Sequence, residues 1–202
     1  MYTLGPEISF AETAAQFLRE QKNSAGNAVH LLYRVKRSDL YFNFMEQFSM
    51  DFLYRKAERS DSEIIAGLFI EMLRTIYNTD DVEGYKSGYL DKYFSEDEDL
   101  IYVAELNKEV VAFLSVEVYR KDSYVYLDDL SVTEEYRGKG VGTKLISLAE
   151  DYSKGLGVSA IVFHVEKTNE RAHRLYRNLG YHDHEDQGTR ILMVKEWFPN
   201  EC

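Results

Sequence analysis

The stretch SYVYLDDLSVTEEYRGKGVGTKLISLAEDYSKGLGVSAIVFHV, residues 123–165, decides the fold. Its first ten residues are rich in β-branched and aromatic side chains and predict a strand. Glycines crowd the turn at 138–142, residues 143–154 predict a helix that ends near Gly155 and Gly157, and the apolar run 159–165 predicts a second strand. A strand, a helix and a strand in this order form a βαβ crossover.

The residues before this unit predict an antiparallel meander. Strands are expected over 100–106 and 110–119, with short turns at 107–108 and 121–122 that antiparallel neighbours allow. Further upstream, 52–57 predicts a strand. Ser60 and Glu63 have capping-box spacing before a helical pattern over 64–77, and the polar and aromatic segment 84–95 fits a short helix or a loop.

After the crossover the chain predicts one more helix and one more strand. Asn169 is a candidate N-cap for a helix over 170–178 that Gly180 ends, and 189–197 predicts the last strand. His182-Asp183-His184 is expected in an exposed turn. The fold class is therefore α/β, a mixed and mostly antiparallel sheet flanked by helices.

Residues 1–49 predict a separate N-terminal extension ahead of a domain over 50–202. Helices are expected over about 9–22 and 39–48, whereas 28–35 fits a strand or a helix equally well. A helical appendage, a contact in a homodimer and a lid over the substrate cleft are all open as its role.

Length and composition describe an ordinary globular chain. The 202 residues are 45% hydrophobic and 29% charged, which fits one domain with an appendage. The longest apolar runs are far below the ~20 residues that cross a bilayer, and the N-terminus lacks the basic start of a secretory signal. The one cysteine, Cys202, is terminal and fits a reducing compartment, so we expect a cytoplasmic protein with no membrane partner.

Charge is unevenly distributed along the chain. The formal net charge is −11, and residues 50–202 carry all of the excess because residues 1–49 hold five basic and five acidic side chains. Eight acids lie between 80 and 99, against two lysines. Such a surface repels phosphate backbones, so nucleic acid is a poor ligand, and a cationic small molecule or a basic peptide is a better one. For any single charge there, a solvated acidic loop that serves solubility is the favoured explanation.

The glycine-rich turn 136–143 is the strongest functional signal. Glycines let backbone N–H groups approach an anion, and the N-terminus of the following helix adds a partial positive charge, so a pyrophosphate fits there. A plain strand-to-helix turn is the alternative. A P-loop is excluded because Thr143, and not lysine, follows Gly142, and a dinucleotide motif is disfavoured because its third glycine comes one residue early.

The turn resembles a known family. Arg137-x-x-Gly140-x-Gly142 between a strand and a helix resembles the acyl-CoA pyrophosphate motif of the GNAT superfamily of N-acetyltransferases. The later segment 169–181, NERAHRLYRNLGY, resembles the helix of that superfamily with its Asn, its Tyr and its closing Gly-Tyr. The resemblance runs from about Met50 to Trp197 and implies the fold already predicted from the pattern of elements.

The resemblance also implies residue roles. Residues at the end of the strand would pair with the pantetheine arm, the turn and helix start would hold the pyrophosphate, and an Asn would contact the cofactor near the arm. The implied residues that bind acetyl-CoA are Leu130, Ser131, Val132, Arg137, Gly138, Lys139, Gly140, Val141, Gly142, Thr143 and Asn169. Tyr176 would face the thioester sulfur and protonate the departing thiolate, since its pKa of about 10 lies just above that of a thiol.

Asp128 is the candidate general base. An alkylamine is mostly ammonium at neutral pH and must lose a proton before it attacks. Water carrying that proton, with Asp128 merely binding the cation, is the competing interpretation. Asp129 should point to the opposite face, because successive strand residues alternate. Tyr176 could equally be a packing residue on an apolar helix face.

The sequence thus predicts an N-acetyltransferase that moves the acetyl group of acetyl-CoA directly to a primary amine, since no cysteine nucleophile is available. The acceptor is expected to be cationic: a polyamine, an aminoglycoside-like compound, or an amine of a peptide. Tyr77, Tyr85, Tyr89, Tyr93 and Phe94 form either an aromatic wall around it or a cover for the core. A non-catalytic acyl-CoA-binding module is the alternative function. No metal site is expected, because the histidines lack ligand spacing.

Overall fold

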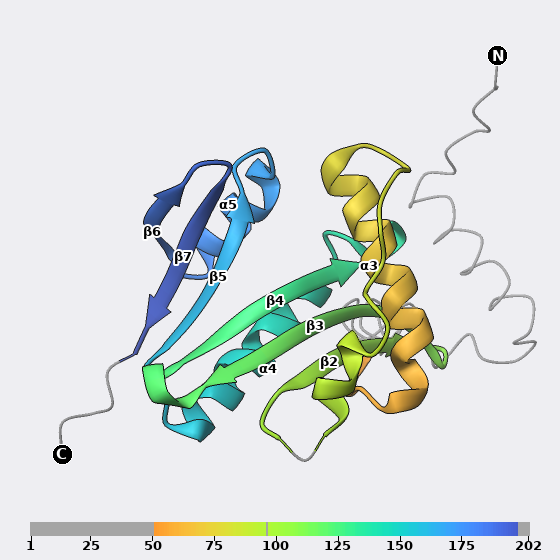
Figure 1. Cartoon of the computed structure of the whole chain (residues 1–202), viewed down its shortest axis with the longest axis horizontal. Coiled ribbons are helices and arrows are strands. Elements are labelled where there is room, and N and C mark those ends of the chain that lie inside the picture. Colours follow the sequence, from red (N-terminus) through yellow and green to blue (C-terminus); the bar gives the residue numbers. More distant parts are fainter. Residues whose placement is uncertain (1–50, 96, 198–202) are drawn as a thin grey trace, which may run out of the picture. The chain divides into compact units, whose positions relative to one another are not determined.

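The computed structural model describes residues 51–95 and 97–197 (Figure 1). The elements expected within 1–49, and Cys202, lie outside the described residues. The described chain forms a seven-stranded sheet in the order β1-β2-β3-β4-β5-β7-β6, and only β4 and β5 pair in parallel within it. The strands are β1 (Leu53–Lys56), β2 (Leu100–Leu106), β3 (Glu109–Tyr119), β4 (Tyr124–Val132), β5 (Ala160–Glu166), β6 (His182–Gln187) and β7 (Arg190–Glu196).

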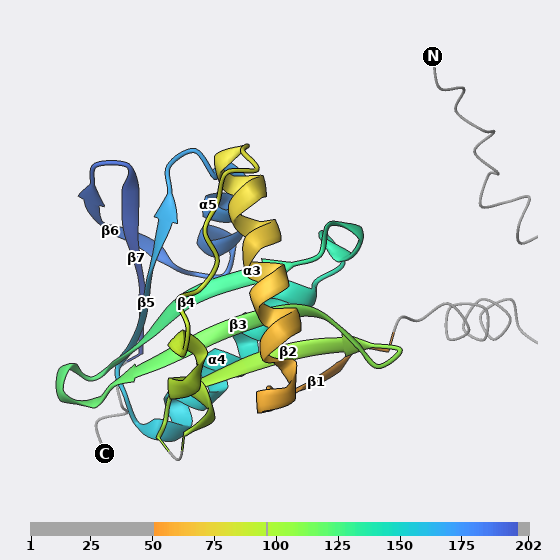
Figure 2. The same ribbon diagram turned by 45° about the vertical axis from the view of Figure 1, so that its right-hand side comes forward.

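Helices cover both faces of this sheet. Helix α3 (Ser62–Tyr77) packs on β3 and β4 from one side, and α4 (Val141–Leu156) packs on β2, β3 and β4 from the other (Figures 1 and 2). Helix α5 (Glu170–Asn178) lies beside β5, and the 3-10 segment η2 (Tyr89–Phe94) follows the loop after α3. The helices predicted over 64–77, 143–154 and 170–178 and the meander are confirmed, and 84–95 contains a short helical segment.

Two hydrophobic clusters hold the layers together. Between the sheet and α4, Leu114 and Val125 pack with Leu145 and Ile146, all almost fully buried. On the other face, Ile65 of α3 packs with strand residues and η2. Burial of this kind stabilises the fold by about 1.5–3 kcal/mol per large apolar side chain.

Strands β4 and β5 separate after the first three residues of each strand. They pair only over Tyr124–Tyr126 and Ala160–Val162, although both strands continue beyond these residues. The two strands diverge from their common start in Figure 1, β4 in green and β5 in light blue. The backbone of β4 after Leu127 is therefore not paired with β5.

A β-bulge interrupts β4 where the strands separate. Leu127 lies opposite Val116 of β3 and Leu130 lies opposite Leu114, so β4 has one residue more than β3 between these pairs. A bulge breaks the regular alternation of side chains. The extra residue falls at Asp128 and Asp129.

The prediction of an exposed turn at His182–His184 is wrong. These residues begin β6, a strand at the edge of the sheet that pairs with β7 and is exposed throughout. Its sequence HDHEDQ carries no apolar residue, so neither period nor burial marks it as a strand. Backbone pairing with β7 forms it, and its charges suit an edge strand.

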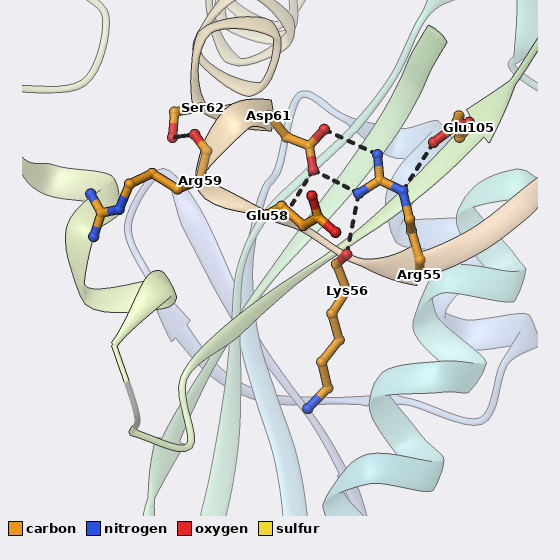
Figure 3. Close-up of polar contacts among 7 residues, drawn as sticks. All are labelled: Arg55, Lys56, Glu58, Arg59, Asp61, Ser62 and Glu105. Atoms are coloured by element: carbon orange, nitrogen blue, oxygen red, sulfur yellow. Dashed lines mark hydrogen bonds and ion pairs between the residues drawn. The ribbon is translucent and has the colours of Figure 1, made fainter. Parts of the chain in front are cut away.

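A network around Asp61 fixes the start of α3 (Figure 3). The Arg55 guanidinium on β1 donates to both Asp61 carboxylate oxygens at 2.6 and 3.0 Å and to Glu105 at 2.9 Å. The Glu58 backbone N–H donates to Asp61 at 2.8 Å, so the capping box joins Glu58 and Asp61 and not Ser60 and Glu63 as the sequence predicts. No helix among the described residues is long and apolar enough to span a membrane.

Candidate active site

A cavity of about 630 Å³ opens beside the end of β4 that does not pair with β5. Its walls come from the C-terminal half of α3, the end of β4, the turn before α4, and α5. Every residue predicted to bind the cofactor borders it except Lys139: Leu130, Ser131, Val132, Arg137, Gly138, Gly140, Val141, Gly142, Thr143 and Asn169. The structure therefore brings residues from β4, the glycine turn and α5 to one place.

The glycine turn takes a backbone that favours glycine. Gly138 and Gly140 have φ of 78° and 83°, in the left-handed region. The first intrahelical hydrogen bond of α4 runs from Lys144 N–H to the Gly140 carbonyl. As at every helix start, the N–H groups of Val141, Gly142 and Thr143 have no acceptor within the helix, and these three residues border the cavity. An anion at this position would meet backbone donors and the positive end of the α4 dipole.

Arginine side chains gather at this cavity. Arg137 borders it while donating through Nε to the Val132 carbonyl at 2.8 Å and through Nη2 to Glu71 at 3.3 Å. Arg171 and Arg174 of α5 also border it, and the sequence analysis missed both. Their spacing of three on a helix was the available signal. A locally basic site exists in this acidic chain, which suits a phosphorylated ligand.

Lys139 and Asn169 have structural contacts of their own. The Lys139 ammonium lies 5.3 Å from the centroid of the Tyr136 ring. The Asn169 side-chain oxygen accepts from the Ala172 N–H at 3.1 Å and so caps α5 as predicted. Asn169 therefore sets the start of the helix that carries Arg171 and Tyr176.

A small cavity of about 20 Å³ adjoins the point where β4 and β5 separate. Asp128 and Tyr176 both border it, so the structure brings the two predicted catalytic residues together. Tyr176 and Leu130 border the large cavity as well. His164 is a further lining residue; its Nδ1 lies 2.9 Å from the Tyr126 hydroxyl and its Nε2 lies 2.8 Å from Gln187.

The Tyr176 ring is packed while its hydroxyl keeps its proton. The ring centroid lies 4.3 Å from that of Phe163, so the packing role considered for this residue is present. Burial raises the pKa of Tyr176 to about 12. The phenol is therefore neutral at neutral pH and is available as a donor.

Three tyrosines spaced by four residues face three carboxylates. The hydroxyl of Tyr85 donates to Asp129 at 2.6 Å, and that of Tyr89 donates to Asp128 at 2.8 Å. The hydroxyl of Tyr93 donates to Glu117 of β3 at 3.0 Å. We call these six residues the tyrosine–carboxylate row. Of the predicted aromatic wall, Tyr85, Tyr89 and Tyr93 thus contact acids, whereas Tyr77 is exposed and Phe94 packs near the Ile65 cluster.

Stacking makes the row rigid. The rings of Tyr85 and Tyr89 are stacked with centroids 4.8 Å apart, and Phe69 of α3 stacks on Tyr85 at 3.8 Å. Because Asp128 and Asp129 bind the hydroxyls of two stacked rings, both carboxylates lie on one side of the sheet. The expectation that Asp129 points to the opposite face is wrong, since the bulge breaks the alternation.

Crowding of the acids shifts their titration. Burial raises the pKa of Asp128 above its usual range. Burial, together with the charge of Asp128, raises the pKa of Asp129 to about 7. Burial and the neighbouring carboxylates likewise raise the pKa of all three tyrosines. A carboxyl that titrates near neutrality is suited to accept and release a proton.

Ser115 of β3 lies in the register opposite the bulge. It is fully buried, and its hydroxyl has no hydrogen-bond partner among the described residues. A buried hydroxyl without a partner costs about 1–3 kcal/mol of desolvation. In the part of the chain that the structure describes, no group of three His, Cys, Asp or Glu residues is arranged to hold a metal ion.

Comparison with known proteins identifies the family of this site. The sequence model of the Acetyltransferase (GNAT) family matches residues 70–181, more than half of the chain. The chain belongs to the GNAT family of acetyltransferases. It is 32% identical over 134 residues to the uncharacterized N-acetyltransferase YhfO of Bacillus subtilis, a match that covers 64% of this chain and 89% of the relative. The superfamily that the motifs resemble is thereby confirmed.

Solved structures share the GNAT fold. The PaiA N-acetyltransferase of Thermoplasma acidophilum, in complex with coenzyme A, aligns over 73% of this chain and 100% of its own length with a TM-score of 0.61 and 19% identity. Naa50 of Arabidopsis thaliana, in complex with the bisubstrate analogue CoA-Ac-MVNAL, aligns over 72% of this chain and 99% of its own length with a TM-score of 0.58 and 19% identity. At these identities the likeness concerns the fold.

The residues present fit the GNAT cofactor. A cavity of about 630 Å³ with a glycine turn, a helix start and three arginines at its walls can accept a long, phosphorylated molecule such as coenzyme A. The end of β4, which pairs with β3 but not with β5, forms a further wall of the same cavity.

Proposed function

We propose that this GNAT protein transfers the acetyl group of acetyl-CoA directly to a primary amine of a small cationic molecule. The observation that carries the proposal is that the two cavities share two lining residues. Tyr176 and Leu130 border both the large cavity at the glycine turn and the small cavity at Asp128. A donor held in the first would thus reach the proton-handling groups of the second.

The donor would be held by β4, the glycine turn and α5. Backbone N–H groups around Gly140 and Gly142 would bind the pyrophosphate, with the nearby arginines offsetting its charge. The backbone at 130–132, which β5 leaves unpaired, would bind the pantetheine arm. Lys139 and Asn169 stay candidate contacts at the edges of this site.

The acceptor would be held by the tyrosine–carboxylate row. Asp128 and Asp129 supply negative charge for an ammonium, and the tyrosine hydroxyls fix the position of both carboxylates. With the pKa of Asp129 near 7, this pair can take up the proton that the ammonium must lose. Asp128, the base favoured by the sequence, and Asp129 would act as one unit.

Bound acetyl-CoA supplies an activated thioester: as the new C–N bond forms, the C–S bond breaks, one amine proton ends on sulfur and one is released. Tyr176 would hold a proton at its hydroxyl beside both cavities. Orientation of the two substrates by the residues above would supply much of the acceleration.

Binding and turnover together test the proposal. Calorimetric titration with acetyl-CoA should show binding, and a thiol-release assay over a panel of amines should show turnover. Replacing Tyr176 by Phe should lower kcat by roughly a hundredfold or more while acetyl-CoA affinity changes little. Tyr181→Phe is the matched control, since Tyr181 packs beside Tyr176 but donates to Glu150 at 3.0 Å.

Each failure has its own meaning. Acetyl-CoA binding without turnover on any amine indicates the non-catalytic acyl-CoA-binding module. Turnover on peptides alone indicates a peptide or protein amine acetyltransferase. An unchanged kcat in Tyr176→Phe removes the role of its hydroxyl, and absence of acetyl-CoA binding rejects the proposal.

A further inference from the structure

Lys92 is a cation held within the tyrosine–carboxylate row. Its ammonium lies 2.5 Å from Glu117 Oε1 and 4.4 and 4.8 Å from the ring centroids of Tyr89 and Tyr93. The Glu117 side chain is only 14% exposed, and that of Lys92 is 37% exposed. An ammonium over aromatic faces and beside a carboxylate has the surroundings in which proteins bind alkylammonium ligands. Here the protein fills that position with its own side chain.

Tyr89 connects this position to Asp128. Its hydroxyl donates to Asp128 at 2.8 Å, and its ring face carries the Lys92 ammonium. Tyr89 therefore lies between the Lys92 ammonium, which contacts its ring, and the Asp128 carboxylate, which accepts from its hydroxyl and borders the small cavity. A flexible diamine with one amine beside Asp128 would bring its second ammonium to the region of Lys92.

The charges of the row are divided between two tasks. Burial raises the pKa of Glu117, but the hydrogen bonds from Lys92, Tyr119 and Tyr93 together outweigh it and leave that pKa below its usual range. Glu117 is thus neutralised within the protein. Asp128 and Asp129 receive hydrogen bonds only from tyrosines in the described contacts, and Lys92 acts on them through its charge alone, so they are the carboxylates left for an acceptor.

We propose that Lys92 is a built-in second cation of the acceptor site, so that the acceptor carries one ammonium on an otherwise uncharged body. This inference rests on the proposed acetyl transfer and narrows its substrate class. The first ammonium of the acceptor would pair with Asp128 and Asp129, which act as one unit. A second ammonium would then meet Lys92 with no further carboxylate of the row to pair with, and like charges at close range are strongly unfavourable.

Two acceptors of equal length test this directly. The probes are 1-aminopentane and 1,5-diaminopentane, which differ in the second amine, and the readout is the ratio of their kcat/KM values. The wild type should prefer the monoamine. Lys92→Met, which keeps length but removes charge, should shift the ratio toward the diamine by roughly tenfold or more. Lys92→Arg keeps the charge and should keep the wild-type preference.

A second variant separates charge from packing. In the double variant Lys92→Met with Glu117→Gln, the carboxylate freed by the first change is removed, so the gain for the diamine should shrink to the part that comes from removing the like charge. A gain as large as that of the single variant, an unchanged ratio in Lys92→Met, or a wild-type preference for the diamine overturns the inference.

Amine binding keeps the test independent of catalysis. Calorimetry with the same two amines, on the full chain saturated with coenzyme A, should show the same shift in the ratio of Kd values. If the shift appears in binding while no amine is turned over, the proposed transfer fails and the assignment of Lys92 stands. If neither protein binds these amines, or the Kd ratio does not change, the assignment of Lys92 is rejected.

Discussion

Asp128 and Asp129 are neighbours in the chain, yet both present their carboxylates to the same pair of stacked tyrosines. The hydrogen bonds from Tyr89 and Tyr85 measure 2.8 and 2.6 Å, and the two rings lie 4.8 Å apart. Two half-buried carboxyls on one side of a strand do not ionise independently. The pair therefore keeps a proton to a higher pH than either acid would in water.

This pair predicts an acidic limb in the pH profile of the enzyme. With the pKa of Asp129 at about 7, kcat should rise as the pH increases through about 7, because the charged pair must be present to accept a proton. Measuring kcat at saturation with both substrates keeps titration of the free acceptor out of the profile. In Asp129→Asn this limb should disappear, and a limb that stays near pH 7 would belong to another group.

The same pair predicts how stability depends on pH. The pKa of Asp129 rises from 3.8 to about 7 on folding, so between these values the folded state binds a proton that the unfolded state lacks. Stability from this group is complete below about pH 3.8 and is lost as the pH rises through 7. Asp129→Asn removes this loss while its side-chain oxygen can still accept from Tyr85.

Thermal unfolding of the wild type and Asp129→Asn at pH 4.5 and at pH 8 measures the effect. The variant should melt at a higher temperature than the wild type at pH 8, and the gap should shrink at pH 4.5. The opposite order at pH 8 would mean that the carboxylate is stabilised in the folded protein. Asp128 shifts in the same direction and retains part of the pH dependence in the variant.

Gly140→Ala tests the anion site at the start of α4. Gly140 has φ of 83°, so alanine adds strain of about 1–2 kcal/mol and disturbs the backbone donors that border the cavity. Acetyl-CoA affinity should fall by roughly tenfold or more. Gly157→Ala is the matched control: Gly157 has φ of 72° and nothing within 4 Å of an added Cβ, and it ends the same helix far from the cavity residues. Equal acetyl-CoA affinity in the two variants would contradict the assignment.

The sequence predicts most of this fold because its signals are local. Hydrophobic period and turn residues mark the meander, and Gly138, Gly140 and Asn169 are the residues that the turn and the helix start require. Asp129 and β6 were predicted wrongly because each depends on a partner strand: the bulge exists only against β3, and β6 only against β7. The proposed role of Lys92 depends on tertiary contacts in the same way, whereas Arg171 was missed although its spacing of three from Arg174 was available in the sequence.

The partly buried ion pair between Arg55 and Asp61 at the start of α3 leads to a prediction about stability alone. The Arg55 guanidinium lowers the pKa of Asp61 and outweighs the effect of burial, so Asp61 stabilises the fold above its unfolded pKa, and this contribution is lost as the pH falls through its folded value. Asp61→Asn keeps an oxygen for the Glu58 N–H but removes the charge, and should cost about 1–3 kcal/mol at pH 7.

Asp91→Asn is the control, since its pair with Arg59 is exposed and should contribute less than about 1 kcal/mol. Urea unfolding of both variants at pH 7 and pH 3 measures this, and a cost of Asp61→Asn that does not shrink at pH 3 would show that shape, and not charge, holds α3 to β1.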